Sequence, residues 1–522
     1  MRRVWTGYWM FGGLVGALVF ASAPPYMYAQ EASGLAAVAA IEQTLVEAIA
    51  RSEQSVVSIA RIKRQAPHIG FEDPFPRAVR GGLRSEFDAD DPSNPDFIPT
   101  DFGSGVVIHV DPPASNLHRA FILTNYHVVK GGTRTVPDEN RPDEYQIWVR
   151  GSNRRGAAAS IYAADPRSDL AVIIVPDSEL KPIKLGDGSR LKKGQLVIAL
   201  GNPYAAARDG SVSASWGMVS NLRRRPAFPR DPLDLEKRKR ETLHDLGDLI
   251  QVDTRLNLGT SGGALINLKG ELVGLTTSLA ALAGFEKSSG FAIPIDATTI
   301  RVIQTLRDGK EVEYGFLGVS FGHPAALMNF PRGDFKQSNA PEGAYVAGLV
   351  VGGPAERAGI LDDDVITNVN GERVFTRDDL TREINKLGPE TKAKITVWRN
   401  SGATGGGTVS VEVTLAKWGA FDEDGIVISQ HRHPVWRGLV IDYSTARDKH
   451  NGEFKPFPKG VLVLKIVPPL DVSQTELVEG NRIVKVNQRP VGTPNEFTDA
   501  VKELRGDVIL ELDNGKKITI HE

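Results

Sequence analysis

The chain has 522 residues, which is too long for one hydrophobic core and predicts about three domains. Hydrophobic residues make up 41% and charged residues 24%, as in ordinary soluble globular proteins, and a formal net charge of -2 argues against nucleic acid as the main partner. The chain has no cysteine. This excludes a thiol nucleophile, a thiolate metal site and a disulfide framework, but leaves export open.

The first residues have the layout of a signal peptide. Arg2 and Arg3 precede an uncharged stretch over residues 4–23 that contains the apolar run "FGGLVGALVFA". "ASA" (residues 21–23) resembles a cleavage site but is followed by Pro24, and Ala29 is a second candidate. The uncharged stretch is also just long enough to span a bilayer. We therefore expect residues 1–29 to be a signal peptide, with a retained N-terminal anchor as the alternative.

The next segments predict a helix, a strand and a long loop. Apolar residues recur at helical spacing over residues 35–49, and "SVVSIARI" (residues 55–62) is typical of a strand. Residues 63–102 contain Asp-Pro and Asn-Pro pairs and acidic clusters without apolar periodicity, which favours a long loop of functional or disordered type.

Many short β-branched runs follow between residues 103 and 294, without helical patterns between them. They predict an all-β sandwich or barrel arrangement. A charged insert at residues 223–242 interrupts them; we interpret it as a solvated loop or helix face, with contact to anionic lipid or a partner as the alternative. The predicted strands are "GVVIHV", "AFILTNYHVV", "YQIWVR", "LAVIIV", "QLVIALG", "ALINLKGELVGLTTS" and "GFAIP".

The C-terminal part contains an internal repeat. The segments that begin at Gly343 and Gly460 match without a gap at an offset of 117 residues. At this offset Asn370 meets Asn487, and the helical pattern that follows matches Leu380 to Phe497. Two copies are too few for a solenoid, so we predict two tandem modules of strands plus a helix.

A candidate catalytic serine lies in "NLGTSGGAL" (residues 257–265), where glycines leave bare backbone beside Ser261. A nucleophile needs such access for a substrate carbonyl and for backbone N–H groups that face the oxyanion. His127 in "LTNYHVV" and Asp169 in "RSDLAV" supply a candidate base and a carboxylate to orient it. Each residue alone also fits a turn or surface role, but the order His, Asp, Ser is that of the chymotrypsin-type triad.

These motifs resemble the HtrA/DegP family of exported serine proteases. "LTNYHVV", "SDLAV", "GTSGGAL" and "GFAIP", followed by the repeated modules, carry the resemblance from about residue 36 onward. It implies a mainly β fold, in which a chymotrypsin-like double β-barrel precedes two α+β PDZ domains. It further implies that His127 is the general base, Asp169 its orienting partner and Ser261 the nucleophile. The N–H groups of Gly259 and Ser261 would form the oxyanion hole.

The resemblance also assigns roles to loops. Residues 63–102 correspond to a regulatory loop, "GNPYAAARDGSVSASWGMVS" to a loop that senses activation, and "SLAALAGFEKSSGFAIP" to one wall of the specificity pocket. Arg255 departs from the family pattern, which has a small residue there, and so puts the preference for small aliphatic residues at the cleavage site in doubt. Our hypothesis is that Arg255 points away from the pocket.

In the first repeat, Gly315, Phe316, Leu317 and Gly318 resemble the PDZ loop that binds a peptide's terminal carboxylate while the peptide adds a strand to the sheet. In the second repeat "WRGLVIDY" replaces this loop, with an arginine before Gly438. We therefore expect PDZ domain 1 to bind peptides and a degenerate PDZ domain 2 to serve assembly.

The predicted domains are the leader at 1–29, the protease at 34–308, PDZ domain 1 at 313–417 and PDZ domain 2 at 433–521. We expect an ATP-independent endopeptidase, since no P-loop is present, which degrades unfolded or damaged proteins in the periplasm and is regulated by C-terminal peptides. The resemblance implies a homotrimer or larger homo-oligomer, which contacts a membrane only if the leader is retained.

Neither a cofactor nor a metal is expected; His431 and His433 are the nearest candidate ligands, and two histidines on a loop are usually surface residues. Two alternatives to the protease remain. A chaperone or scaffold would bind unfolded chains with little cleavage. An esterase would also use a serine, but the residue order and the absence of a strand–turn–helix G-x-S-x-G elbow argue against it.

Overall fold

The computed structural model describes residues 26–64, 99, 101–112, 114–135, 143–151, 156–176, 179–202, 211–224, 242–243, 247–277, 290–321, 340–400, 406–420, 429, 434–447, 456–468 and 476–522. The chain divides into two compact units, residues 1–47 and residues 48–522. The boundary falls within the first helix, and all sites discussed below belong to the second unit.

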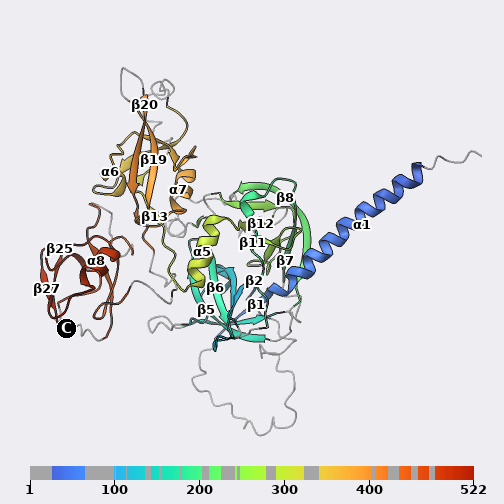
Figure 1. The fold of residues 1–522 in the computed structure, drawn as a ribbon, viewed down its shortest axis with the longest axis horizontal. Helices are drawn as coiled ribbons and strands as arrows, with labels where there is room; N and C mark the ends of the chain where they lie inside the picture. Colours follow the sequence, from blue (N-terminus) through green and yellow to red (C-terminus); the bar gives the residue numbers. More distant parts are fainter. Residues whose placement is uncertain are drawn as a thin grey trace, which may run out of the picture. The chain divides into compact units, whose positions relative to one another are not determined.

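Six antiparallel strands form a first closed barrel, in the order β1-β2-β3-β6-β5-β4 (Figure 1). Its interior is filled by aliphatic side chains, among them Val57, Ile122 and Ile173, which are fully removed from solvent. Closure of the sheet leaves no unpaired edge strand. The strands are β1 (Val56–Lys63), β2 (Asp101–Val110), β3 (Ala120–Asn125), β4 (Tyr145–Arg150), β5 (Gly156–Asp165) and β6 (Leu170–Val175).

A second closed barrel repeats this architecture in the order β10-β11-β12-β9-β8-β7. Its core is likewise aliphatic and includes Val197, Val252 and Leu265. β10 pairs with both β7 and β11, which fixes the segment immediately before it against the centre of the barrel. The strands are β7 (Leu196–Gly201), β8 (Ser213–Arg224), β9 (Leu249–Val252), β10 (Ala264–Ile266), β11 (Leu272–Thr277) and β12 (Gly290–Pro294).

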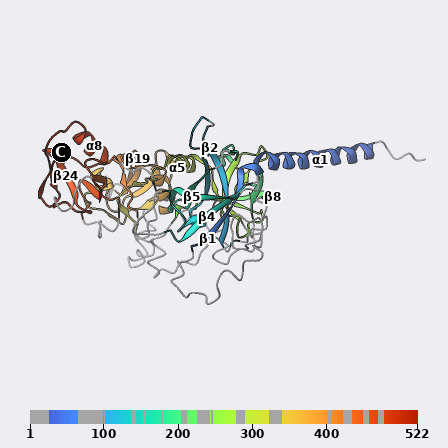
Figure 2. The same ribbon diagram turned by 90° about the horizontal axis from the view of Figure 1, so that it is seen from below.

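Helices are few in the barrel region. Figure 2 shows α1 (Tyr26–Ser52) as one continuous helix, and a 3₁₀ turn, η1 (Glu53–Ser55), joins it to β1. α2 (Tyr126–Val129) is a single turn after β3, and η3 (Gly188–Arg190) precedes β7. α5 (Ala297–Arg307) begins where the side chain of Asp296 accepts the N–H of Thr299. Among the described helices, none combines the length and apolarity that crossing a membrane requires.

The first α+β module follows α5. Its main sheet has the order β15-β17-β19-β20, and α7 packs the buried side chains of Leu380 and Ile384 against it. Its elements are β13 (Gly315–Phe316), β14 (Val319–Ser320), β15 (Ala344–Tyr345), β16 (Gly348–Leu349), α6 (Pro354–Arg357), β17 (Val365–Val369), β18 (Glu372–Arg373), α7 (Arg377–Asn385), β19 (Lys392–Asn400), β20 (Gly406–Thr414) and β21 (Ala416–Lys417).

The second module has its own sheet, in the order β22-β23-β24-β26-β27 with β25 paired to β24, and its own core around Phe497. Thr493 directly precedes α8 as Thr376 directly precedes α7, and each threonine side chain accepts the N–H of the residue three positions later. The elements are β22 (Leu439–Tyr443), β23 (Val461–Ile466), β24 (Arg482–Val486), β25 (Arg489–Pro490), α8 (Pro494–Val501), β26 (Val508–Leu512) and β27 (Lys517–Ile520).

The fold class predicted from the sequence is confirmed: two six-stranded barrels precede PDZ-like sheets. The predicted strand "AFILTNYHVV" is wrong in its second half, because β3 ends at Asn125 and the chain turns into α2. Strands β5, β8 and β9 were not predicted, because small and polar residues interrupt their apolar pattern. The predictions for the leader, for most of the loop 63–102 and of the charged insert, and for His431 and His433 concern residues outside the described ones.

Candidate active site

His127 and Asp169 meet at one end of the first barrel. β3 runs directly into α2, which carries His127, and Asp169 immediately precedes β6. β3 and β6 are neighbours, with Asn125 opposite Leu170. His127 Nδ1 lies 2.8 Å from Asp169 Oδ2, and the N–H of His127 donates to Asp169 Oδ1 at 3.0 Å. Strand pairing therefore joins two of the three predicted catalytic residues.

The backbone of Asp169 is also tightly held. Its φ angle is +53°, in the left-handed region that aspartate tolerates better than most residues. Its carbonyl accepts the N–H of Tyr126 at 2.9 Å and the side-chain amide of Asn125 at 3.2 Å. A carboxylate fixed on Nδ1 selects the His127 tautomer that carries its proton there, which leaves Nε2 as a proton acceptor.

Ser261 lies on the loop between β9 and β10 of the second barrel, and is 3% exposed. Ser104 on β2 of the first barrel holds this loop at two points. The N–H of Ser104 donates to Ser261 O at 2.8 Å, and its hydroxyl donates to Gly259 O at 2.7 Å. Ser104 thus ties the loop to the barrel that carries His127. The sequence analysis missed this residue, which stands 155 positions before Gly259 and has no motif of its own.

Two glycines beside Ser261 are required by close packing. Gly259 has a φ angle of +93°, and a Cβ there would lie 2.5 Å from Asn202 O. Gly262 has a φ angle of +81°, and a Cβ there would lie 2.1 Å from Ser104 O. Any side chain at either position would push the loop away from its supports. The bare backbone around the candidate nucleophile therefore has a structural cause as well as the predicted role in substrate access.

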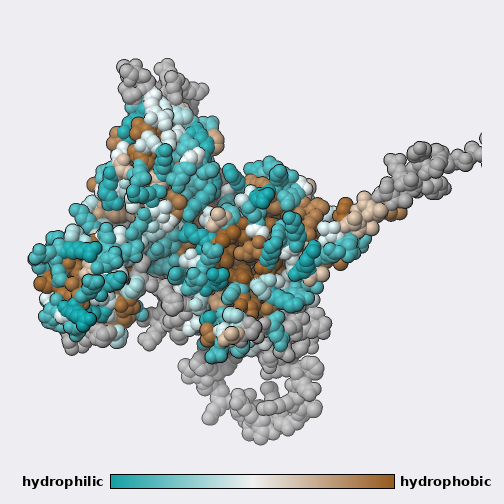
Figure 3. Space-filling view, viewed as in Figure 1, coloured by the Kyte–Doolittle hydropathy of each residue, from teal (hydrophilic) through white to brown (hydrophobic). Residues whose placement is uncertain are grey.

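Hydrophobic side chains are exposed on the second barrel. Trp216 on β8 is 63% exposed, and Met218 and Leu258 are also exposed. Figure 3 shows hydrophobic residues gathered over the barrel strands on the face seen in Figure 1. Arg255 is exposed too, and its N–H donates to the hydroxyl of Ser215 at 3.3 Å, so its segment runs beside β8. The second barrel thus offers apolar surface on the strand next to Arg255.

The predicted carboxylate loop forms one edge of the first α+β module. Gly318 has a φ angle of +81°, and its carbonyl accepts the N–H of Val350 at 3.0 Å. Val319 pairs with Leu349 in β16, and the bonds on either side of this pair belong to Gly318 and Ser320. The N–H and C=O of Val319 therefore point to the opposite edge of β14, where an added strand would bind.

The corresponding loop of the second module is built differently. Arg437 has a φ angle of +45° and donates from its guanidinium to Gly506 O at 2.7 Å. The N–H of Leu439, at the position of Val319, donates to Trp436 O at 2.8 Å. The Trp436 ring stacks edge-on against Phe497 of α8, with centroids 5.8 Å apart. This loop is closed by hydrogen bonds within its own backbone, and its tryptophan packs on the core of the second module.

Comparisons with known proteins agree with this architecture. Residues 103–275 match the trypsin-like peptidase domain family, and residues 315–415 match the PDZ domain family. A probable periplasmic serine endoprotease of DegP-like type from Pseudomonas putida is 31% identical over 411 residues, which cover 77% of this chain and 74% of the relative. A protein of the same description from Brucella suis is 30% identical over 418 residues, covering 78% and 71%.

Among solved structures, the HtrA-type protease AlgW with a tripeptide is similar over 73% of this chain and 99% of that chain, with 23% identity and a TM-score of 0.48. The two barrels and the family matches define a serine endoprotease with a trypsin-like domain followed by a PDZ domain. The identity and coverage of the relatives assign it further: the chain belongs to the HtrA/DegP family of serine proteases.

Proposed function

We propose that this chain is an ATP-independent serine endopeptidase that degrades unfolded or damaged exported proteins. Ser261 is the nucleophile, His127 the general base and Asp169 the residue that orients the base. The contact of 2.8 Å between His127 Nδ1 and Asp169 Oδ2 is the observation that carries the proposal. A buried carboxylate on this ring nitrogen, on a trypsin-like scaffold with a glycine-flanked serine, is the arrangement that serine proteolysis requires.

In the proposed reaction, His127 Nε2 removes the proton from Ser261 Oγ as this oxygen attacks the substrate carbonyl. Asp169 stabilises the imidazolium that results. The N–H groups of Gly259 and Ser261 donate to the oxyanion of the tetrahedral intermediate. The imidazolium then gives its proton to the leaving amine, which breaks the peptide bond and leaves an acyl-enzyme. His127 then removes a proton from water, which attacks the acyl-enzyme carbonyl. The ester bond to Ser261 breaks, Ser261 Oγ regains the proton and the second product leaves.

The surface of the second barrel supports the proposed substrate class. Exposed Trp216, Met218 and Leu258 form an apolar surface to which the hydrophobic residues of an unfolded segment can bind. Folded proteins rarely expose such hydrophobic residues in one patch. Arg255 points away from the specificity pocket in this proposal, so residues before the cleaved bond are small and aliphatic. Mapping the cleavage sites on an unfolded protein checks this, and a preference for Asp or Glu there would contradict it.

Peptide binding to PDZ domain 1 (residues 313–417) regulates the protease in this proposal. The directed N–H and C=O of Val319 support strand addition at β14, with the terminal carboxylate on the loop from Gly315 to Gly318. PDZ domain 2 (residues 433–521), whose loop is closed by Trp436, serves assembly.

The relatives' description as periplasmic supports export of this chain to the periplasm by residues 1–29. We further propose a homotrimer or larger homo-oligomer, measured by light scattering of residues 30–522. A monomer at micromolar concentration would contradict this part of the proposal.

The test is cleavage of an unfolded, casein-like substrate by residues 30–522 without ATP, beside the variants Ser261→Ala, His127→Ala and Asp169→Asn. Losing one member of a catalytic triad lowers kcat by about 10⁴-fold or more, so each variant should show almost no cleavage. Thr254→Ala, a buried hydroxyl outside the triad, is the matched control and should retain activity. If wild type and Ser261→Ala were equally inert while both suppressed aggregation of the substrate, the chain would be a chaperone instead.

A further inference from the structure

The turn that carries Asp169 is shaped by a second aspartate. Residues 165–169 connect β5 to β6, and the carboxylate of Asp165 accepts the N–H groups of Arg167 at 3.3 Å and Ser168 at 3.1 Å. The N–H of Asp169 donates to Pro166 O at 3.2 Å. Asp165 is buried at the base of this turn. Whatever fixes the Asp165 carboxylate therefore fixes the backbone that leads into Asp169.

A residue from the start of the PDZ region binds this carboxylate. The hydroxyl of Tyr314 donates to Asp165 Oδ2, and both side chains are buried. Burial and the neighbouring carboxylate raise the pKa of Tyr314 well above its usual value, so the phenol stays protonated and remains a donor. Tyr314 directly precedes the carboxylate loop, and its own carbonyl accepts the N–H of Trp418, which follows β21 of the PDZ module.

A second connection reaches the end of helix α7. The guanidinium of Arg167 lies over the ring of Trp418, 4.2 Å from its centroid, and donates to Asn385 Oδ1 at 3.0 Å. Arg301 on α5 of the protease region donates to the backbone carbonyl of Asn385 at 3.3 Å. Asn385 is the last residue of α7 and is 2% exposed. Two arginines of the protease region thus hold one buried asparagine of the PDZ module.

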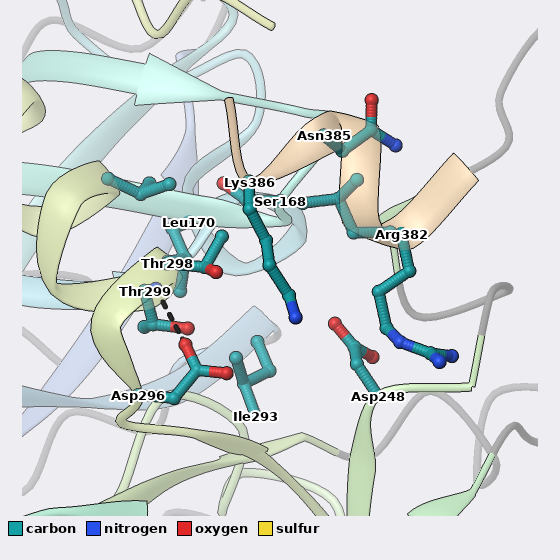
Figure 4. A pocket seen from close by; sticks show the side chains of 12 residues that line it. Ser168, Leu170, Asp248, Ile293, Asp296, Thr298, Thr299, Arg382, Asn385 and Lys386 are labelled. Atoms are coloured by element: carbon teal, nitrogen blue, oxygen red, sulfur yellow. Dashed lines mark hydrogen bonds between the residues drawn. The ribbon is translucent and has the colours of Figure 1, made fainter. Parts of the chain in front are cut away.

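Packing alone does not fix the turn on this side. A cavity lies beside Ser168 and Leu170, and Arg382, Asn385 and Lys386 of the α7 end line its other wall (Figure 4). Figure 4 shows the side chain of Lys386 reaching into this cavity from the end of α7. Because the turn borders empty space here, the hydrogen bonds from Tyr314 and Arg167 limit its movement.

We propose that Asn385, Arg167 and Tyr314, here named the Asn385 clamp, are positioning residues through which PDZ domain 1 sets the orientation of the catalytic aspartate. The inference rests on the proposed role of Asp169 toward His127. α7 is a helix of the peptide-binding module, and Tyr314 adjoins the carboxylate loop, so both ends of the clamp move with that module. A displacement of α7 is transmitted through Arg167 to the turn, and from the turn to the contact between Asp169 and His127.

The test uses residues 30–522 with Asn385→Leu, which keeps the volume but removes the acceptor, and Tyr314→Phe, which removes only the hydroxyl. Asn385→Asp retains an acceptor for Arg167 and is the conservative rescue. Arg377→Ala, at the exposed start of the same helix, is the matched control. Turnover of a short chromogenic peptide is measured per active site, titrated with a fluorophosphonate, so that a smaller folded fraction does not lower the apparent kcat.

We expect Asn385→Leu and Tyr314→Phe to lower kcat by about tenfold with KM changed less than about twofold, as for loss of an interaction that acts in the transition state. Asn385→Asp and Arg377→Ala should stay within about twofold of wild type in both constants. Unchanged kcat per active site in Asn385→Leu and Tyr314→Phe would overturn the clamp.

Amide hydrogen exchange gives a readout that does not depend on proteolysis. The N–H groups of Arg167, Ser168 and Asp169 are bonded within the turn, and we expect them to exchange at least about tenfold faster in Asn385→Leu and Tyr314→Phe than in wild type. Equal exchange in all variants would overturn the clamp even if the protease were fully active. Faster exchange in a chain that cleaves nothing would support the clamp while refuting the proposed function.

Discussion

The two PDZ-like modules have the same scaffold but differ at the binding loop. Asn370 and Asn487 both occupy a left-handed turn, and each accepts a backbone N–H from the next strand with its side chain. Leu380 and Phe497 fill the same place on α7 and α8. At the loop, however, the N–H and C=O of Val319 face the edge of β14 opposite β16, whereas the N–H of Leu439 is bonded to Trp436 O. The two modules thus share the residues that form the scaffold and differ in the loop that would bind a peptide.

The largest expected effect separates the two cores. Leu380→Ala and Phe497→Ala each remove a buried side chain, which typically destabilises by about 2–5 kcal/mol. We expect each substitution to destabilise its own module. Hydrogen exchange of the intact chain, read separately over residues 340–400 and 476–522, measures this. If either substitution destabilised both modules equally, the two would form one cooperative unit and the comparison would fail.

The next effect concerns the loops. Gly318→Val forces a β-branched side chain into a left-handed position, and Gly438→Val does the same in the second module. Hydrogen bonds to a charged group contribute about 1.5–3 kcal/mol, so we expect Gly318→Val to weaken binding of a hydrophobic C-terminal peptide by about tenfold or more. Gly438→Val should leave the affinity unchanged. Calorimetric titration with the peptide decides, and equal losses would show that both loops bind.

A smaller effect is expected at the helix N-caps. Thr376→Ala and Thr493→Ala each remove a side-chain acceptor at the start of a helix, which costs about 1 kcal/mol. The carboxylate of Asp379 accepts hydrogen bonds from the N–H groups of both Phe375 and Thr376. The carboxylate of Glu496 accepts one from the N–H of Gly492. We therefore expect the larger loss at Thr376. Denaturant unfolding followed by exchange in each module measures it, with Thr381→Ala as the control, a half-buried threonine within α7 whose hydroxyl donates to Arg377 O.

The smallest effect is a pH dependence that Tyr345 adds to the first module. Burial and the hydrogen bond to Asp363 raise the pKa of Tyr345 to about 12, and Leu462 occupies this position in the second module. Because the folded state holds this proton more tightly, its stabilising contribution is complete below pH 10 and is lost as the pH rises toward 12. Thermal melts of wild type and Tyr345→Phe over this range should diverge, and parallel curves would contradict the assignment.

Local patterns in the sequence predicted the scaffold well. The apolar run "LAVIIV" became β6 without change of bounds, and the repeat offset matched Leu380 of α7 to Phe497 of α8. The glycines at 259 and 262 marked the loop that carries Ser261. These features are set by residues close together in the chain, so a local sequence pattern can predict them.

The sequence did not reveal the supports of the site. Ser104 holds the Ser261 loop from the other barrel, and Tyr314 reaches Asp165 from 149 residues away. Strands made of small residues, such as "GAAASIYAAD", lack a clear apolar alternation. The residues they pack against, rather than their own pattern, decide their conformation. Contacts of this kind arise only once the barrels close and the segment between α5 and β13 packs against them.

The most direct experiment measures whether peptide binding to PDZ domain 1 governs catalysis at Ser261. Cleavage of an unfolded substrate by residues 30–522 is followed while a hydrophobic C-terminal peptide is titrated into wild type, Gly318→Val, Gly438→Val and Ser261→Ala. We predict stimulation in wild type and Gly438→Val, basal cleavage without stimulation in Gly318→Val, and no cleavage in Ser261→Ala. Stimulation of Gly318→Val equal to that of wild type would contradict the central claim.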